Sequence, residues 1–471
     1  MFPATAALLV APLALLWFFI NLRTQKNGHP LPPGPRGLPL IGNLHMMGQL
    51  PHRTLRRLAQ KYGPIMSLRL GLVPAVVVSS PEAAELFLKT HDLAFASRPK
   101  TQIAKHFFYG YKGLILTEYG PSRRNLRRLC TVKLLNPAKI DSFAGKRRRE
   151  VESMVASINA AAEAREAVDV SLKVAEVVEN MVCQMMIGRS GDGRFKLKEA
   201  FQEGTQLAGV FNIGEFVPAL LPLDLQGVSR AIKAAAQRLD KTWDLIINER
   251  IKEGRDEEQS EDFIDVLLSQ ANTSVGDHHN EDGDPPSSPI DRENIKAILL
   301  DMFGAAMDTS ASTIEWAVSE IFRHPDVMRK LQDEISSVVG LGRTVAEEDL
   351  AKLPYLEMVV KEGMRLHPAV PLLLPHESME ETTINGYRIP NKSRIIVNAW
   401  AIMRDTNAWP DRPEEFVPER FENSSVEAVG RDFQLIPFGS GRRGCAGIKL
   451  GLTFVRLVVA QLVHCFDWEL A

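Results

Sequence analysis

Residues 433–447 read FQLIPFGSGRRGCAG, and an apolar run with helical spacing follows them from 448 to 465. Cys445 therefore precedes a predicted helix, where free backbone N–H groups and the positive end of the helix dipole stabilise a thiolate. Glycines at 439, 441, 444 and 447 let the backbone approach a flat ligand closely. Arg442 and Arg443 can neutralise acidic groups at the edge of that ligand. This stretch predicts a thiolate site for a flat, acidic cofactor.

The same stretch allows two other interpretations. Most lone cysteines are buried structural residues, and Cys130, Cys183 and Cys465 stand in apolar helical contexts that fit this role. The glycines at 439, 441 and 444 also match a dinucleotide-binding fingerprint, with the strand-like residues 433–436 before it. That fold needs a second parallel strand and further βα units, and the sequence up to residue 471 leaves no room for them.

Composition narrows the class of protein. The chain has 471 residues, with 56 Lys and Arg against 58 Asp and Glu, so its formal net charge is −2. This balance argues against an electrostatic nucleic-acid binder. The 45% hydrophobic and 24% charged residues are typical of a globular protein. Four scattered cysteines resemble neither a disulfide scaffold nor a paired zinc site, so we expect one large domain in a reducing compartment.

The amino end predicts a membrane anchor. Residues 2–22 carry no charge and are long enough to span a bilayer once as a helix. A cleaved signal peptide is the alternative, but no basic region precedes the run and no convincing cleavage site follows it. Arg23 and Lys26 come after the span, which favours a cytosolic body. Residues 23–45 form a proline-rich hinge, and 46–471 form the main domain.

Helical spacing dominates the main domain, so we predict a mainly α fold with a small β-sheet region. Alternating β-branched residues predict strands within 65–79, around Gly71, and within 383–397, around the turn dipeptide Asn385-Gly386. The acidic, polar stretch between 254 and 289 predicts a mobile surface loop. The predicted helices cover 51–62, 81–91, 138–164, 227–254, a long run starting near Pro289, and 325–339.

The long run predicts a helix from the cap at Ser288-Pro289 to His324. Small residues at 304–306 lie within it and let a flat group approach the backbone. Asp308 and Thr309 then bring polar groups into an apolar neighbourhood. Close helix packing, with the threonine hydroxyl bonded to the preceding turn, is the alternative explanation.

The pattern Phe438-x-x-Gly441-x-Arg443-x-Cys445-x-Gly447 resembles the haem-thiolate signature of the cytochrome P-450 monooxygenases. Further matches follow in family order along nearly the whole chain, and the hinge and the cysteine loop look most like the plant microsomal branch. These matches are the proline-rich hinge, AAMDT at 305–309, Glu362-x-x-Arg365, and PERF at 418–421.

The resemblance implies a cytochrome P-450 fold, a single large haem-binding domain behind an N-terminal transmembrane helix. Cys445 would be the axial thiolate of the iron of haem b, with Phe438 beside the sulfur. Thiolate ligation favours oxygen activation. The other residues implied for haem binding are Gly439, Gly447 and Ala305 near the ring and Arg443, His376, Arg127 and Arg123 near the propionates.

Asp308 and Thr309 resemble the acid–alcohol pair that passes protons to bound dioxygen. Glu362, Arg365 and Arg420 resemble a buried structural network that holds the cysteine loop. Two departures stand out, because the family usually has Gly where Ala306 stands and Trp where Arg123 stands. Ala306 bears on how oxygen consumption is coupled to product formation. Arg123 bears on the local geometry near a haem propionate.

The implied function is an oxidoreductase that hydroxylates a lipophilic small molecule, a terpenoid or an aromatic or phenolic specialised metabolite. It would use O2 and electrons from NADPH delivered by a cytochrome P-450 reductase, at the endoplasmic reticulum membrane with the domain facing the cytosol. The basic run 146–149 is either a reductase-docking site or a solvated helical face. Substrate contacts would come from Phe107, Phe108, Phe303, Val370 and Leu372.

Two alternatives remain open at this stage. The family continues past the segment resembling 466–470 with a pocket-lining hairpin, so we expect domain 46–471 to be truncated at its C-terminal end. The chain would then be a non-catalytic haem-binding membrane protein. A second alternative is haem-dependent isomerase or dehydratase chemistry on peroxides without a reductase, against which the Asp308-Thr309 pair argues.

Overall fold

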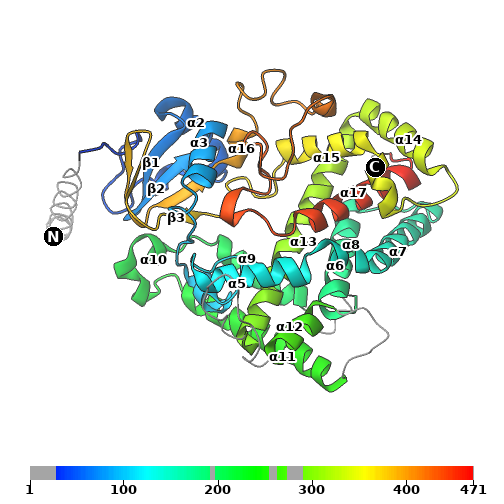
Figure 1. The fold of residues 1–471 in the computed structure, drawn as a ribbon, viewed down its shortest axis with the longest axis horizontal. Helices are drawn as coiled ribbons and strands as arrows, with labels where there is room; N and C mark the ends of the chain where they lie inside the picture. Colours follow the sequence, from blue (N-terminus) through cyan, green and yellow to red (C-terminus); the bar gives the residue numbers. More distant parts are fainter. Residues whose placement is uncertain (1–27, 191–196, 254–261, 273–289, 470–471) are drawn as a thin grey trace, which may run out of the picture.

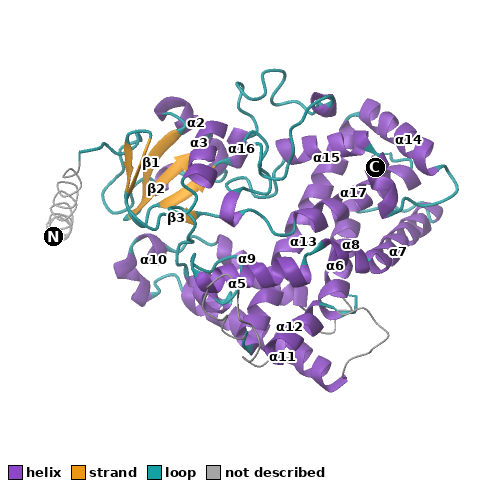
Figure 2. Ribbon diagram, in the orientation of Figure 1, coloured by secondary structure: helices purple, strands orange, loops and turns teal. Residues whose placement is uncertain are grey.

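The computed structural model describes residues 28–190, 197–253, 262–272 and 290–469. The predicted anchor, 2–22, and the first residues of the predicted hinge lie outside these ranges. Within them the chain is mainly helical with a small sheet region at one end (Figure 1; Figure 2). The predicted fold class is confirmed.

The helices mostly follow the predicted ranges. The apolar spacing places α2, α14 and α17 as expected, and the predicted helix 138–164 divides into α6 and α7 at Phe143. The helices are α2 (Pro51–Tyr62), α3 (Pro81–Glu85), α4 (Gln102–His106), α5 (Pro121–Leu129), α6 (Pro137–Ser142), α7 (Ala144–Glu163), α8 (Val170–Ile187), α9 (Leu197–Gly209), α10 (Ile213–Phe216), α11 (Val228–Glu253), α12 (Phe263–Asn272), α13 (Arg292–Arg323), α14 (Pro325–Val339), α15 (Pro354–Leu366), α16 (Ala399–Ile402) and α17 (Ile448–Cys465).

Two helix predictions need correction. The long helix α13 begins at Arg292 rather than at Ser288-Pro289, because Asp291 caps it: its carboxylate accepts the Asn294 N–H, and the Asn294 side chain accepts the Asp291 N–H. The acidic stretch 254–289 also contains an ordered helix, α12, whose apolar residues 263, 264, 266 and 267 are buried. The rest of that stretch lies outside the described residues.

The strands form two sheets rather than the one predicted. A four-stranded sheet has the order β1-β2-β6-β3, and β2 pairs parallel with β6. The turn at Asn385-Gly386, where both residues have positive φ, joins β4 to β5 alone, so this hairpin stays apart. The strands are β1 (Ile65–Leu70), β2 (Val73–Val78), β3 (His376–Glu377), β4 (Thr382–Ile384), β5 (Tyr387–Ile389) and β6 (Arg394–Val397).

Helix α13 runs through the centre of the helical part and packs against α8, α15 and α17 (Figure 1). Among the described residues, α17 is the one helix long and apolar enough to cross a membrane, and more than half of that span is buried inside the protein. Its apolar residues pack into the main core. The loop that carries Cys445 therefore enters the core immediately beside the central helix.

The basic run 146–149 does not form one charged face. Arg147 is fully buried on α7, where its guanidinium binds both oxygens of Glu347 at 2.6 and 2.7 Å. Lys146 is half-buried and donates to the Gln184 carbonyl at 3.3 Å. Arg148 and Arg149 remain exposed. The run is therefore not wholly a solvated face, because helical periodicity places Arg147 on the same buried side of the chain as Phe143 and Val151.

Candidate active site

The cysteine loop is held by its own backbone and by α17. The Cys445 N–H donates to the Phe438 carbonyl at 3.0 Å, which closes the loop, and the Gly447 N–H donates to Cys445 Sγ at 3.3 Å. Phe438 is partly buried in the core, against Gly451 of α17. Gly447 is the N-cap residue of α17, which begins at Ile448, so the sulfur lies beside the free N–H groups at that end.

Glycine is required at two positions of this loop. Gly439 and Gly441 have φ of 66° and 67°, in the left-handed region that side chains disfavour. A Cβ on Gly441 would lie 2.0 Å from the Leu88 carbonyl oxygen. The loop therefore packs against the end of the turn 86–90 only because residue 441 has no side chain.

The Cys445 thiol combines exposure with desolvation. Its side chain is open to solvent, yet burial raises the pKa of the thiol, and the Gly447 N–H and the Arg127 guanidinium only partly oppose this. The Gly447 N–H at the helix end lowers the pKa of the thiol, whereas desolvation raises it.

Arg443 is a half-buried residue of the loop whose guanidinium binds only backbone carbonyls. Its guanidinium donates to the carbonyls of Ala96, Ile115 and Thr117, the last two at 3.3 and 2.5 Å. Burial and the neighbouring arginines lower its pKa to about 8. Three carbonyls fix the direction of this cation without neutralising it.

Arg98, which the sequence analysis missed, joins the same cluster. Its Nη1 donates to the carbonyls of Leu374 and Pro375 at 2.5 and 2.9 Å, and burial, with Arg123 nearby, lowers its pKa to about 9. Arg123 is also buried, and burial and Arg127 lower its pKa to about 10. The sequence signal for Arg98 is weak: a charge two residues after the apolar pair Phe95-Ala96 and directly before Pro99.

Arg127 and His376 complete the cluster. Arg127 Nη1 donates to the Gly444 carbonyl at 2.6 Å, one residue before the cysteine. His376 is buried with Nδ1 2.9 Å from the Phe95 carbonyl, and burial and Arg98 hold its pKa well below the ordinary value. The imidazole is therefore neutral: Nδ1–H donates to the Phe95 carbonyl, and Nε2 is left as an acceptor.

This cluster fits the propionates of a haem. No ion pair within the described ranges joins a carboxylate to any of the four arginines, so two buried and two half-buried like charges lack counter-ions. The Nε atoms of Arg98 and Arg123 are buried and have no hydrogen-bond partner. The two propionate carboxylates of a bound haem would supply the missing counter-ions and the missing hydrogen-bond acceptors. The four arginines are Arg98, Arg123, Arg127 and Arg443.

The middle of α13 presents its small and polar residues to open space. Ala305 and Asp308 are exposed although the helix crosses the core, while Phe303 and Met307 are buried. The Thr309 hydroxyl donates to the Ala305 carbonyl at 2.6 Å, which is the back-bonding that the packing explanation anticipated. Burial raises the pKa of Asp308, and Lys198 opposes this rise. This carboxyl can therefore exchange protons closer to neutral pH than an ordinary aspartate.

Asp301, two turns earlier on α13, anchors the loop that binds Arg443. Its Oδ2 accepts the N–H groups of Leu114 and Ile115 at 2.5 and 2.9 Å, and burial raises its pKa to about 7. The Ile115 carbonyl in turn accepts from Arg443. Asp301 thus positions Arg443 through the loop backbone. Sequence reasoning missed it, although an acid within the apolar run 297–303 was the available signal.

The structure brings Glu362, Arg365 and Arg420 into one network. Both Glu362 oxygens bind Arg365, at 2.7 and 2.9 Å, and Oε1 also accepts from Arg420 at 2.9 Å. The side chains of Glu362 and Arg365 are fully buried. Arg365 also donates to the carbonyls of Met403 and Pro413 at 2.8 and 2.7 Å. The network ties α15 to the long loop that precedes the cysteine.

The five residues predicted to contact substrate do not all meet. Phe107 and Phe303 are buried against α9, Phe107 close to Gly204 and Phe303 edge-on to Phe201 at 5.4 Å between ring centres. Phe108 packs edge-on against Phe107, and Val370 is half-buried. Leu372 packs instead into the separate cluster beneath the sheet.

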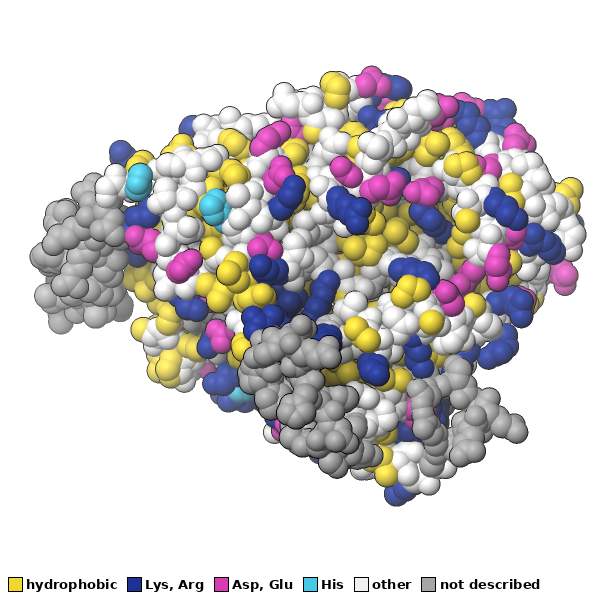
Figure 3. Space-filling model, in the orientation of Figure 1, with side chains coloured by type: hydrophobic (Ala, Val, Ile, Leu, Met, Phe, Trp, Pro, Cys, Tyr) yellow, Lys and Arg dark blue, Asp and Glu magenta, His cyan; other side chains and the backbone are white. Residues whose placement is uncertain are grey.

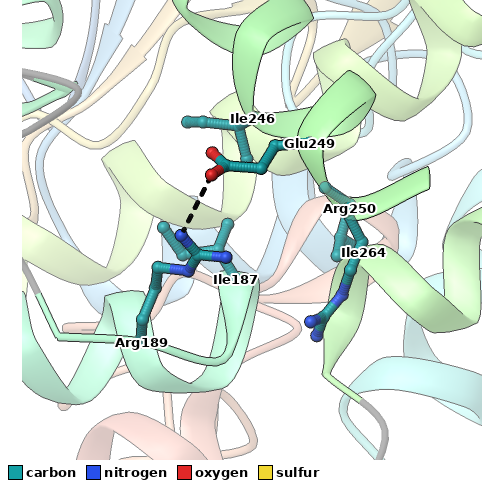
Figure 4. A pocket seen from close by; sticks show the side chains of 6 residues that line it. All are labelled: Ile187, Arg189, Ile246, Glu249, Arg250 and Ile264. Carbon is teal, nitrogen blue, oxygen red and sulfur yellow. Dashed lines mark ion pairs between the residues drawn. The ribbon is translucent and has the colours of Figure 1, made fainter. Parts of the chain in front are cut away.

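A small pocket is formed by residues between 187 and 264, and they do not include the site residues described above. It is lined by residues of α8, α11 and α12 and by Arg189, which pairs with Glu249 at 3.8 Å (Figure 4). Its cavity volume of about 10 Å³ holds roughly one water molecule. This pocket is a packing defect between helices and not a cofactor site.

Fold and site together define a haem-thiolate protein, with an exposed cysteine before a core helix and buried cations without counter-ions. The family model described as cytochrome P-450 matches residues 32–471. The chain belongs to this family, whose members are monooxygenases that bind haem through a cysteine thiolate and use O2 and a redox partner.

The similar proteins agree with this assignment. The chain is 55% identical to cytochrome P-450 CYP736A12 of Panax ginseng, covering 100% of this chain and 93% of that protein. It is 44% identical to a flavonoid 3'-monooxygenase of Arabidopsis thaliana, covering 97% and 89%. A solved zebra fish cytochrome P-450 with progesterone superposes with a TM-score of 0.72 at 25% identity, covering 88% of this chain and 92% of that one.

Proposed function

We propose that this chain hydroxylates a lipophilic aromatic or phenolic metabolite, or a terpenoid, with electrons from NADPH delivered by a cytochrome P-450 reductase. The observation that carries the proposal is the exposed Cys445 beside four arginines, two buried and two half-buried, that form no ion pair with a described carboxylate. The flavonoid 3'-monooxygenases among the similar proteins support an aromatic substrate. The non-catalytic alternative is not favoured, because the residues of the site and of the proton pair are all present.

Each side chain has a proposed part. Cys445 would ligate the iron through its thiolate, and Arg98, Arg123, Arg127 and Arg443 would hold the propionates, with His376 packed beside them. When bound, thiolate-ligated haem activates O2 for insertion of one oxygen atom into the substrate. Thr309 holds water next to Ala305, and Asp308 exchanges protons with solvent through its exposed carboxyl. Phe107, Phe108, Phe303 and Val370 enclose the substrate and exclude bulk water.

The reductase is proposed to dock on the face that carries α5. Figure 3 shows Lys and Arg side chains gathered near the middle of this face. Helix α5 and the residues after it carry no acid between 119 and 140. An acidic flavoprotein domain would be attracted to this surface. The exposed cations proposed to contact it are Arg124, Arg128, Lys133, Arg442 and Lys449.

We also propose the endoplasmic reticulum membrane as its location, with 2–22 as the anchor and the domain in the cytosol. The uncharged run and the basic residues that follow it support this orientation. The plant relatives match the chain over nearly its full length.

The first test is the reduced, carbon-monoxide difference spectrum of the full chain in membranes. A Soret band at the thiolate position is expected, and a band typical of a neutral ligand would refute the assignment. Flavonoids and simple phenols would then be incubated with NADPH and reductase. Hydroxylated product that needs both NADPH and reductase is expected, and turnover of peroxides without either would favour isomerase chemistry.

The variant Thr309→Val tests the proton pair. Valine keeps the shape but lacks the hydroxyl, so product formation should fall by about a hundredfold, the lower end for a positioned proton donor. The carbon-monoxide spectrum should be unchanged. Thr313→Val, one turn later on α13 with a similar hydroxyl-to-carbonyl bond of 2.7 Å, is the matched control. Equal losses in both variants would assign Thr309 a helix-packing role.

A further inference from the structure

A groove with a volume of about 740 Å³ lies between α2 and the segment 400–414. One wall is the outer face of α2, and the other is formed by Trp400 and the residues that follow it, up to Glu414. Leu55 turns the apolar face of α2 into the cluster beneath the sheet, where it is fully buried. The polar face of α2 is therefore left to line the groove.

The groove has an excess of positive charge. Four arginines line it against one carboxylate, Glu414, and α2 contains no acid. Glu414 is shared, since Oε1 pairs with Arg56 at 2.5 Å and Oε2 with Arg404 at 3.1 Å. Arg53 and Arg57 are exposed, and neither forms an ion pair with any described residue. Two guanidinium groups thus remain available to an anion.

An aromatic floor holds these cations in place. The guanidinium carbons of Arg404, Arg56 and Arg53 lie 4.3, 5.4 and 5.8 Å from the centre of the Trp400 ring. Stacking on an indole reduces the freedom that an arginine loses when it binds a ligand. Guanidinium groups match the geometry of phosphate oxygens and bind them in pairs. The groove is therefore suited to a phosphate group.

Exposed aliphatic side chains near the groove indicate which kind of phosphate compound it binds. Leu50, which lines the groove, is 49% exposed, and Leu31, Leu38 and Ile41 are 42%, 48% and 38% exposed in the segment that leads to α2. This segment and α2 lie at the same end of the molecule (Figure 1). Exposed aliphatic side chains next to a basic amphipathic helix are typical of a membrane surface.

We propose that the groove binds the phosphate of an anionic phospholipid, and that the aliphatic side chains of 31–50 contact the same bilayer surface. This inference rests on the proposed membrane location, which it deepens by naming a headgroup site. Arg53 and Arg57 bind the phosphate oxygens. Arg56 and Arg404, already paired with Glu414, keep the local potential positive.

The test is an equilibrium titration of the full-length haem protein in nonionic detergent. The probes are dihexanoyl-phosphatidylserine, dihexanoyl-phosphatidylcholine and inorganic phosphate. Saturable binding of the serine lipid is expected, with the double variant Arg53→Gln, Arg57→Gln weakening it by about tenfold or more, the effect of losing a charged hydrogen bond. Both residues are exposed, so the fold should be unaffected.

The matched control is Arg148→Gln, Arg149→Gln, which removes the same charge from an exposed part of α7. Equal weakening in the two double variants, or equal affinity for the two lipids, would overturn the site. Equal affinity for inorganic phosphate would overturn the lipid assignment. The carbon-monoxide spectrum of the same sample reports separately on the proposed function, so a missing thiolate band with intact lipid binding refutes that function alone.

Discussion

The arginines around the cysteine loop and the arginines beneath α15 differ in what balances them. Arg365 and Arg420 share the carboxylate of Glu362, and backbone carbonyls take their remaining donors. Arg98 and Arg443 are bound to carbonyls alone, and burial depresses their pKa values to about 9 and about 8. The balanced cluster is complete without a ligand, whereas the unbalanced cluster is complete only with an anion. Charge balance therefore separates the scaffold from the binding site, although both use buried arginine.

The largest expected effect is at the cysteine. Cys445→Ser removes the thiolate but keeps the loop, whose closing N–H bond to Phe438 is made by the backbone. The thiolate-type carbon-monoxide band should disappear completely, with circular dichroism unchanged. Cys465→Ser, at the far end of the helix α17 that follows the loop, should keep the band. A retained band in Cys445→Ser would show that another residue ligates the iron.

The balanced cluster of Glu362, Arg365 and Arg420 should lose its stabilising effect when its one acid, Glu362, is neutralised. Glu362→Gln leaves Arg365 and Arg420 buried without a counter-ion, which should cost about 3–5 kcal/mol of unfolding free energy. Chemical denaturation and haem content measure this loss. Glu357→Gln, a half-buried carboxylate on the same helix that pairs with Lys361, should cost under about 1 kcal/mol. Similar costs at both positions would mean that the network is not specially dependent on its acid.

The unbalanced cluster should respond differently in the apoprotein and the haem-bound protein. Arg98→Gln removes one of several buried like charges, so the apoprotein should lose little stability while haem dissociates faster. Heme transfer to apomyoglobin and thermal unfolding of both forms measure this. Arg420→Gln should destabilise both forms equally. An apoprotein weakened by Arg98→Gln as much as the haem-bound form would remove the distinction between the clusters.

The smallest effect concerns the link from α13 to Arg443. Burial raises the pKa of Asp301 from 3.8 to about 7, so the folded chain favours the protonated carboxyl. Its contribution to stability is fully present below pH 3.8 and is lost as pH rises towards 7. Asp301→Asn should therefore lose less thermal stability than the wild type between pH 4 and 7. Asp326→Asn, at an exposed position, should follow the wild type, and so would Asp301→Asn if the carboxyl stayed ionised throughout.

Local sequence was sufficient for the helices and for the cysteine loop. Apolar spacing located α2, α14 and α17, because each helix buries one face against the core. The glycines at 439 and 441 and the cysteine before a helix identified the site, since positive φ and a close backbone contact are demands that only glycine meets. The start of α13 was misplaced, because both Ser288 and Asp291 can cap a helix and the fold selects one.

The tertiary structure alone decided which charges are buried and what balances them. The sequence shows Arg98, Arg147 and Arg443 as ordinary cations and gives no sign that one binds Glu347 while the other two bind only carbonyls. Asp301 acquires its role from loop 113–117, which is distant in the sequence. Desolvation and Coulomb interactions depend on where distant segments meet. The apolar periodicity of one segment determines its local structure. It carries no information about which distant segments that segment contacts.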